Sequence, residues 1–267
     1  MTGVTTLNDK IFVIYEELPC IIVYMSQEPY NRLADIGISE LKDPQDIAVS
    51  SSCLYVSDPV SVAIWRVTAA NSKVDQWLSG VEAMSVSVTS EEKLMLLVWI
   101  DFEGSVEEHN WTWYGEIHVY SESAVKETVI RLSHDITAPW CAVATTKKTV
   151  IVSYGYEWHE INGVCELDMN GCMLKTFGSS PGEGVGQLKG PGYVSLDDEE
   201  RIIVADTANN RVLLLKKQLM QQVLVTWHPQ SLDEDAWGPV RLHYDSRSGR
   251  LLVGLDNGHL DIYELRT

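Results

Sequence analysis

The sequence predicts an all-β protein that folds as a six-bladed β-propeller with four-stranded antiparallel blades, the last of which lacks its outer strand. The first observation is a recurring phrase in which apolar residues follow a proline by three and five positions, before a polar turn and a β-rich strand. The phrase begins at Pro44, Pro139, Pro191 and Pro239. Successive phrases are 95, 52 and 48 residues apart, or two repeats and then one each. A period of about 48 residues is close to that of propeller blades, and helical periodicity appears over no usable length.

The repeat divides the chain into blades. We expect one domain over 1–267, with blades at approximately 1–41, 42–80, 81–136, 137–178, 179–230 and 231–267. Strands are predicted at 46–49, 54–57, 62–67 and 74–78 in the second blade, and at 193–196, 202–205, 212–215 and 222–226 in the fifth. The sixth has strands only at 240–244, 251–254 and 260–265. An unpaired strand edge favours aggregation. We therefore expect the propeller to be the interaction domain of a larger protein, rather than a ring closed by inner strands alone.

Charge and cysteine content narrow the function classes. The formal net charge is −18, which opposes binding to nucleic acid. No apolar run approaches the roughly 20 residues of a membrane helix, and residues 1–6 show no signal-peptide pattern. The five cysteines are scattered and odd in number, as expected for reduced thiols in a cytoplasmic protein.

The stretch 164–225 shows the repeat most clearly. Asn170-Gly171 suits a tight hairpin, a glycine cluster follows at 182–186, and the strand at 202–205 ends in Asp206-Thr-Ala-Asn-Asn-Arg211. The order of these pieces resembles an NHL repeat. The resemblance implies a six-bladed interaction module that binds proteins or, in some members, RNA on a basic face. It also implies that the Asp206 turn is structural, with Asp58 and Asp256 in similar places. RING, B-box and coiled-coil segments often precede the module in that family, and none is present in this chain.

Alternating strand direction places the long loops on one face of the disc. Connections between second and third strands, and between successive blades, share that face, and loops on a rigid scaffold are where binding usually resides. The insertion at 101–115 and the loops at 154–160 and 227–238 are rich in aromatic residues. The candidate binding residues are Trp111, Trp113, Tyr114, Tyr154, Tyr156, Trp158, His159, Trp227 and Trp237. Trp65, Trp77 and Trp99 lie within strands and are assigned to the core.

Motifs for other chemistry fit poorly. The glycine cluster at 182–186 has Gln187 where the third glycine of a phosphate loop is required, and it precedes a strand. Gly163 stands where a second histidine would complete a zinc motif after His159-Glu160. We therefore predict no cofactor and no metal site. His159 with a nearby carboxylate remains an alternative as a general acid–base pair.

The favoured function is a non-enzymatic, protein- or peptide-binding propeller. Its aromatic and acidic face suits a segment that carries Lys or Arg, through stacking and cation–π contacts. Two alternatives remain. One is a propeller enzyme of the metal-dependent lactonase or lyase type, although the inner strands begin with Asp46, Trp140, Tyr193 and Arg241, which is no evident ligand ring. The other is a binder of sugars or small molecules at the central channel.

Overall fold

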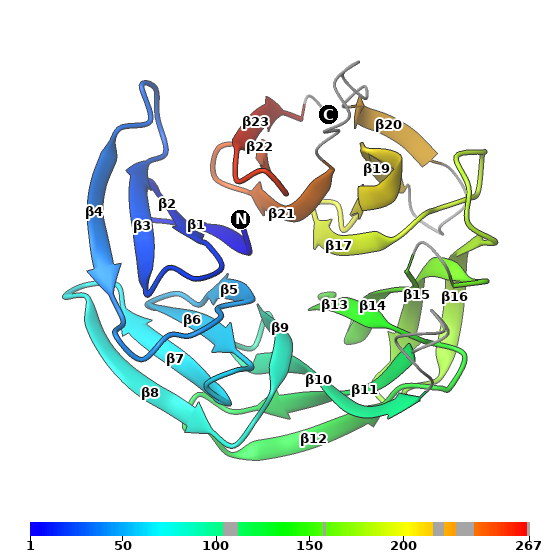
Figure 1. Ribbon diagram of the computed structural model, residues 1–267, viewed down its shortest axis with the longest axis horizontal. Helices are drawn as coiled ribbons and strands as arrows, with labels where there is room; N and C mark the ends of the chain where they lie inside the picture. Colours follow the sequence, from blue (N-terminus) through cyan, green and yellow to red (C-terminus); the bar gives the residue numbers. More distant parts are fainter. Residues whose placement is uncertain (104–111, 157–158, 216–221, 228–237, 266–267) are drawn as a thin grey trace.

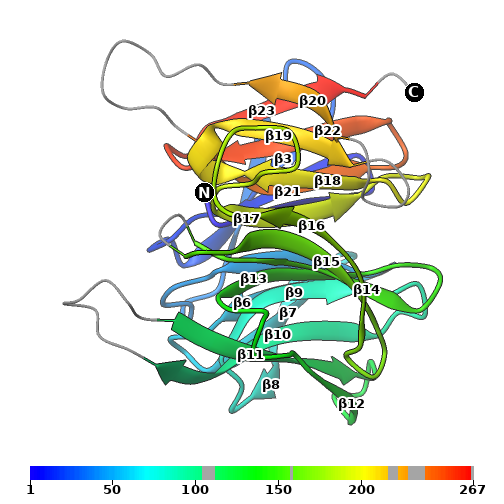
Figure 2. The same ribbon diagram turned by 90° about the vertical axis from the view of Figure 1, so that its right-hand side faces the viewer.

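Six antiparallel sheets surround a central axis and form the blades of a propeller (Figure 1). The structure is a computed structural model and describes residues 1–103, 112–156, 159–215, 222–227 and 238–265. The sheets of neighbouring blades pack face to face (Figure 2). The strands of blades 1 to 3 are β1 (Gly3–Leu7), β2 (Lys10–Ile14), β3 (Cys20–Met25), β4 (Arg32–Gly37), β5 (Asp46–Val49), β6 (Cys53–Asp58), β7 (Ala63–Thr68), β8 (Lys73–Ser79), β9 (Ala83–Val88), β10 (Leu94–Glu103), β11 (Thr112–Tyr120) and β12 (Lys126–Arg131).

The second half of the ring repeats this arrangement with one exception. Blades 4 and 5 are four-stranded, whereas blade 6 has three strands, as predicted. The strands of blades 4 to 6 are β13 (Pro139–Ala144), β14 (Thr149–Tyr154), β15 (Asn162–Asp168), β16 (Met173–Ser179), β17 (Pro191–Leu196), β18 (Ile202–Asp206), β19 (Arg211–Leu215), β20 (Gln222–Trp227), β21 (Pro239–Asp245), β22 (Arg250–Leu255) and β23 (Leu260–Glu264).

The first strand of each blade lines the central channel, and the ring closes through these strands. β1 contacts β5 on one side and β21 and β22 on the other. Contacts between inner strands therefore close the ring, and the expectation that the propeller belongs to a larger protein stays a prediction. Polar contacts support the closure, because Arg241 of β21 donates to the carbonyl of Thr2.

Burial follows from the position of each strand within its blade. Second strands are covered on both faces by neighbouring blades, and all six residues of β6 are buried. Outer strands face solvent, and β4 is almost fully exposed. Between successive blades the apolar side chains form separate cores, for example the one that joins blade 1 to blade 2 around Ile21, Leu54 and Trp65. The hydrophobic effect thus holds the ring together blade against blade.

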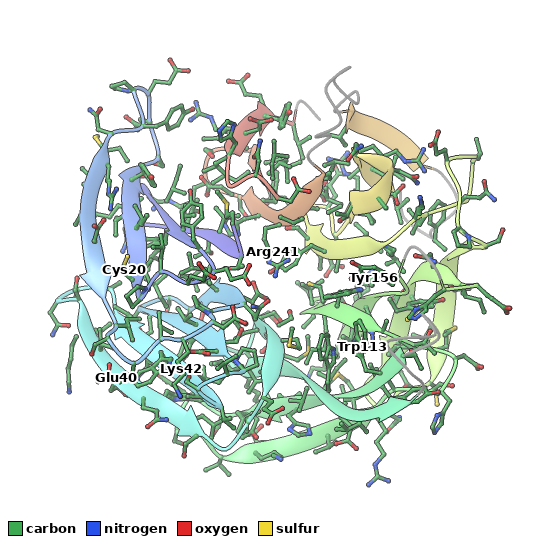
Figure 3. The ribbon with its side chains drawn as sticks, viewed as in Figure 1. Cys20, Glu40, Lys42, Trp113, Tyr156 and Arg241 are labelled. Atoms are coloured by element: carbon green, nitrogen blue, oxygen red, sulfur yellow. The ribbon has the colours of Figure 1, made fainter. Side chains whose placement is uncertain are left out.

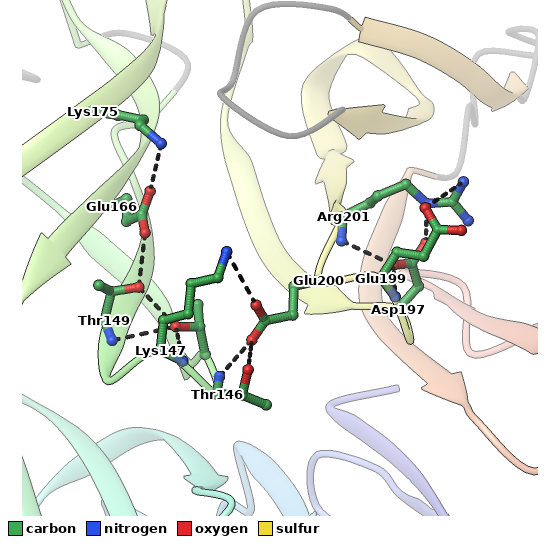
Figure 4. A network of polar contacts seen from close by, with 10 residues as sticks. Thr146, Lys147, Thr149, Glu166, Lys175, Asp197, Glu199, Glu200 and Arg201 are labelled. Carbon is green, nitrogen blue, oxygen red and sulfur yellow. Dashed lines mark hydrogen bonds and ion pairs between the residues drawn. The ribbon is translucent and has the colours of Figure 1, made fainter.

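Polar contacts join the turns that connect first and second strands, on what we call the turn face. Between blades 4 and 5, the Thr146 N–H donates to Oε1 of Glu200 at 2.5 Å, and Lys147 Nζ lies 3.7 Å from Oε2 of the same carboxylate (Figure 4). Between blades 2 and 3, the Ser51 N–H donates to Glu92 at 2.9 Å. These contacts fix the rotation of adjacent blades at the rim of the channel.

Buried aspartates hold the chain on the opposite face, which we call the loop face. Asp206 at the end of β18 accepts hydrogen bonds from the Lys189 N–H at 2.6 Å and from Arg211 Nε at 2.7 Å. Asn209 Nδ2 donates to the same carboxylate at 2.8 Å. Asp58 at the end of β6 holds the connection between β4 and β5 in the same way, because its carboxylate accepts the Lys42 N–H at 2.7 Å. The predicted structural role of the Asp206 turn is confirmed.

Candidate functional site

An aromatic cluster lies on the loop-face side of blades 3 and 4. It consists of Trp99 on β10, Trp113 on β11, Trp140 on β13 and Tyr156, which follows β14. The Trp140 ring is at the centre, with ring centroids 5.8 Å from Trp99, 5.2 Å from Trp113 and 5.6 Å from Tyr156. Figure 3 shows Trp113 further from the channel and Tyr156 nearer to it. Edge-to-face and tilted packing of this kind stabilises aromatic groups beyond the area they bury.

Two indole groups of the cluster are anchored by backbone carbonyls. Trp99 Nε1 donates to the Pro139 carbonyl at 3.0 Å, and Trp140 Nε1 donates to the Gly155 carbonyl at 3.1 Å. Because the N–H groups are used internally, the ring faces are the parts of these side chains that can meet a ligand. Trp99, Trp140 and Tyr156 are half-buried, whereas Trp113 is buried.

The turn that carries Tyr156 is held from below by Asn162. The buried Asn162 side chain donates to the carbonyls of Tyr156 and His159, at 2.9 and 3.1 Å. His159 Nδ1 accepts the Tyr156 N–H at 3.2 Å. Gly155 is required here because its φ is +97° and a Cβ atom would lie 2.5 Å from the Ile161 carbonyl oxygen. The Tyr156 ring is therefore presented by a fixed turn.

The predicted binding residues fall into three groups. Tyr156 joins the cluster, His159 lies half-buried in the same turn, and the half-buried Tyr114 packs on His134 with centroids 4.6 Å apart. Trp113 and Tyr154 are 4% exposed, and the Tyr154 hydroxyl lies 3.2 Å from Thr176 Oγ1, so their role is to support the surface rather than form it. Trp111, Trp158 and Trp237 lie outside the described residues, and Trp227 ends β20 without a described side chain.

Two other differences from the sequence analysis concern blade 3. The flanks of the predicted insertion are strand, because Asp101, Phe102 and Glu103 of β10 pair with Tyr114, Trp113 and Thr112 of β11. This extension places Trp113 on a strand, facing the core. Trp99 was assigned to the core, yet a register shift between Trp99 and Asp101 accompanies its half-buried position. A β-bulge re-aims a side chain, and periodicity alone does not reveal it.

Two exposed acidic residues lie in the loops next to the aromatic cluster. Asp135 lies in the loop before β13, and Glu160 lies in the loop after β14. The two loops are joined, because the Gly155 N–H contacts the carbonyls of Thr137 and Ala138 at 2.9 and 3.1 Å. An aromatic surface bordered by negative charge attracts cations.

A second polar group occupies the central channel. Asp46 of β5 is buried, and its carboxylate accepts the Tyr193 hydroxyl at 2.9 Å and the N–H groups of Ile47 and Val86 at 2.9 and 3.0 Å. Arg241 lies over the Tyr193 ring at 5.3 Å, near the centre of the ring of blades in Figure 3. It donates to the carbonyls of Val240 and Gln45 at 2.7 and 2.9 Å. We call Asp46, Tyr193 and Arg241 the channel cluster.

The electrostatics of the channel cluster follow from burial. Desolvation raises the pKa of Asp46, and the charge of Arg241 and the hydrogen bonds from Val86 and Tyr193 oppose that rise. Desolvation together with the Asp46 charge raises the pKa of Tyr193 well above its usual range. The three side chains connect inner strands of blades 2, 5 and 6 and use their polar groups within the protein. Sequence reasoning placed these residues at strand starts and did not foresee their contact, which depends on ring closure.

Among the described residues, no three His, Cys, Asp or Glu side chains are grouped as a metal site would require. No helix in the described part of the chain has the length and apolar character needed to cross a membrane.

Comparison with known proteins shows the fold. No family model matches the chain, and no curated protein matches it in sequence. Hydrazine synthase from Kuenenia stuttgartiensis is similar in structure, with a TM-score of 0.68 and 13% identity over 98% of this chain and 75% of that one. A chain of the nidogen/laminin complex has a TM-score of 0.63 and 12% identity, over 86% of this chain and 80% of that chain.

Virginiamycin B lyase from Staphylococcus aureus is similar over the whole chain, with a TM-score of 0.59 and 8% identity, covering 84% of the lyase chain. At these identities the likeness concerns the path of the backbone and not the site residues. The chain is a six-bladed β-propeller.

Proposed function

We propose that this propeller is a non-enzymatic binding module that captures a peptide or protein segment carrying Lys or Arg on the aromatic cluster. The observation that carries the proposal is the anchored, half-buried set of Trp99, Trp140 and Tyr156 beside the exposed Asp135 and Glu160. A cation over an aromatic face is bound more strongly when it is partly desolvated. The formal net charge of −18 favours association with basic segments.

The proposal includes the assignment of the blades to the NHL type of repeat. The Asp206 turn, with Asn209 and Arg211 bonded to its carboxylate, supports it. All five cysteines are free, which supports a reducing compartment such as the cytoplasm. The channel cluster is a weaker candidate for a ligand site, because Asp46 and Arg241 each make several hydrogen bonds within the chain.

A peptide array tests the proposal. Nine-residue peptides with a central Lys, Arg, Ala or Glu are probed with the wild-type chain and with Tyr156→Ala and Trp140→Ala. We expect Lys- and Arg-centred peptides to be retained, and each variant to bind them about tenfold more weakly, as cation–π contacts and interface hot spots of this kind require. Leu174→Ala, which removes an exposed apolar side chain from β16 outside both the aromatic cluster and the groove beside β23, is the control and should bind as the wild type does.

Thermal melting establishes that each variant is folded. Tyr156 begins the turn that His159 closes and is not part of the cores on either side of blade 4, so Tyr156→Ala provides a test even if Trp140→Ala unfolds. Equal retention of Glu-centred and Lys-centred peptides, or binding that is insensitive to Tyr156→Ala, would contradict the proposal.

A further inference from the structure

The fourth strands of the other blades show what blade 6 lacks. Each of the five packs one or more apolar side chains into the core between its own blade and the next. Those residues include Ile36, Trp77, Ile130, Phe177 and Val225. In blade 2, for example, the Trp77 ring meets Tyr120, on the third strand of blade 3, with centroids 6.0 Å apart. Within the described chain, the core between blades 6 and 1 receives no such residue.

The edge of blade 6 is shaped to receive a strand. β23 is the third and outermost strand of blade 6, so its free edge faces the position that β4, β8, β12, β16 and β20 fill in the other blades (Figure 1). The Leu255 N–H donates to the His259 carbonyl at 2.9 Å, and the Leu265 N–H donates to the Gly249 carbonyl at 3.2 Å. Because an antiparallel ladder alternates, the N–H and C=O groups of Leu260 and Ile262 point away from β22. These groups form the ladder that an added strand would use.

A groove of about 420 Å³ lies between this edge and blade 1. Leu260 and Ile262 form one wall, and Tyr15, Tyr24 and Tyr30 form the other. The Tyr15 hydroxyl donates to the Gly258 carbonyl at 3.1 Å and joins the walls at one end. Tyr24 lies on the third strand of blade 1, as Tyr120 does on that of blade 3. The groove therefore has the position that Trp77 fills between blades 2 and 3.

Charge indicates the kind of strand that fits. The residues that line the groove include the acidic residues Glu28 and Asp261, and no Lys or Arg among the described residues that form it. The exposed Glu264 lies at the end of β23. A second copy of β23 would bring Asp261 and Glu264 against the same carboxylates, and like charges across a strand pair are destabilising. A strand with basic residues and an apolar centre is complementary instead.

We propose that β23 binds an extended segment of a partner polypeptide as an antiparallel fourth strand of blade 6. Main-chain hydrogen bonds to Leu260 and Ile262 provide the attachment, as in other complexes formed by strand addition. One β-branched or aromatic side chain of the partner enters the groove against Tyr24 and Tyr30, and flanking Lys or Arg residues meet Glu28 and Asp261. This binding site is separate from the aromatic cluster and does not depend on it.

Amide hydrogen exchange, followed by NMR, tests the proposal. The probe is a capped hexapeptide with the sequence of β12, Lys-Glu-Thr-Val-Ile-Arg, which is basic at both ends and has β-branched residues at its third, fourth and fifth positions. At millimolar peptide, we expect the Leu260 and Ile262 amides to exchange about tenfold more slowly, since protection reports newly formed hydrogen bonds. The same peptide with N-methyl groups on alternate amides cannot complete the ladder and should give no protection.

Two variants locate the site. Tyr30→Ala and Ile262→Ser should each weaken the peptide's effect about tenfold, because both remove apolar surface from the groove. Tyr156→Ala should leave the effect unchanged, whereas it should weaken Lys-peptide binding at the aromatic cluster about tenfold, so the two proposals fail separately. The proposal is overturned if neither amide is protected, or if the N-methylated peptide protects them equally. It is also overturned if sedimentation shows a dimer whose formation protects both amides without peptide.

Discussion

His243 on β21 accepts the N–H of Thr6 on β1, with Nε2 3.2 Å from the Thr6 nitrogen and 2.8 Å from Thr6 Oγ1. The two residues are 237 positions apart, and their contact joins the last blade to the first. Acceptance at Nε2 requires a neutral imidazole. Burial lowers the pKa of His243 from 6.5 to about 4, against a weaker opposing effect of Asp245. The closure of the ring is therefore linked to a titratable group.

The first prediction concerns pH. Between pH 6.5 and about 4, the unfolded chain binds a proton at His243 that the folded chain does not. The free energy of unfolding should therefore decrease as pH falls through this window, with His243 contributing roughly 3 kcal/mol of the change. In His243→Gln the amide oxygen can accept the Thr6 N–H at any pH, so urea denaturation at pH 4.5 and 7 should show a smaller decrease. His134→Gln, at an exposed histidine, is the control and should retain the wild-type profile. Retention of that profile by His243→Gln would exclude His243 as the source.

The second prediction compares a buried ion pair with a half-exposed one. Arg211 Nε lies 2.7 Å from Asp206, and the exposed fractions of their side chains are 11% and 0%. Asp206→Ala leaves Arg211 without its carboxylate and frees the Lys189 N–H, so we expect a loss of about 3 kcal/mol or more in unfolding free energy. The pair Arg66–Asp75 has exposed fractions of 30% and 32%.

Asp75→Ala should cost less than about 1 kcal/mol, because solvent screens that pair. Urea denaturation with matched m-values measures both changes. Equal costs for the two variants would show that the Asp206 turn does not hold the loop of residues 182–190.

The third prediction concerns the channel cluster. Tyr193→Phe removes the hydroxyl that donates to Asp46 at 2.9 Å, and hydrogen bonds to charged groups contribute about 1.5–3 kcal/mol. In the wild type this hydrogen bond opposes the rise in the pKa of Asp46. Its removal should therefore raise the pKa of Asp46 further. When the pKa of a carboxyl group is higher in the folded chain than in the unfolded chain, the free energy of unfolding decreases as pH rises. The cost of Tyr193→Phe should therefore be greater at pH 8 than at pH 4.

Tyr244→Phe is the matched control for this change. The Tyr244 hydroxyl donates at 2.9 Å to Asp198, an exposed residue, so its removal should cost less than about 1 kcal/mol at both values of pH. Urea denaturation at both pH values distinguishes the variants, and a cost for Tyr193→Phe that falls as pH rises would contradict the assigned role of Asp46.

The strand order could be predicted because it depends on local chemistry. Proline is tolerated at the first residue of a strand, and β13, β17 and β21 begin at Pro139, Pro191 and Pro239. The predicted strand at 62–67 lies one residue from the observed β7 (Ala63–Thr68). Turn residues and apolar alternation fix such segments without reference to distant parts of the chain.

The candidate sites could be predicted only in part. Aromatic residues in the loop after β14 were expected on one face, and Tyr156 lies there. The orientation of Trp99 follows a register shift in blade 3, and the burial of Trp113 follows from the extension of β10 and β11, which the sequence showed only as an insertion. Periodicity assigns a residue to a strand but does not determine how the next blade covers it.

The sequence alone determined the all-β class, the number of blades, the short last blade and the acidic character of the chain, because strand periodicity, turn residues and net charge are local or additive properties. Only the tertiary structure decided which residues meet. It brought Asp46 to Tyr193 across 147 positions, joined Thr6 to His243, and left a groove between β23 and blade 1. These contacts arise when the ring closes, and closure depends on the packing of all six blades together.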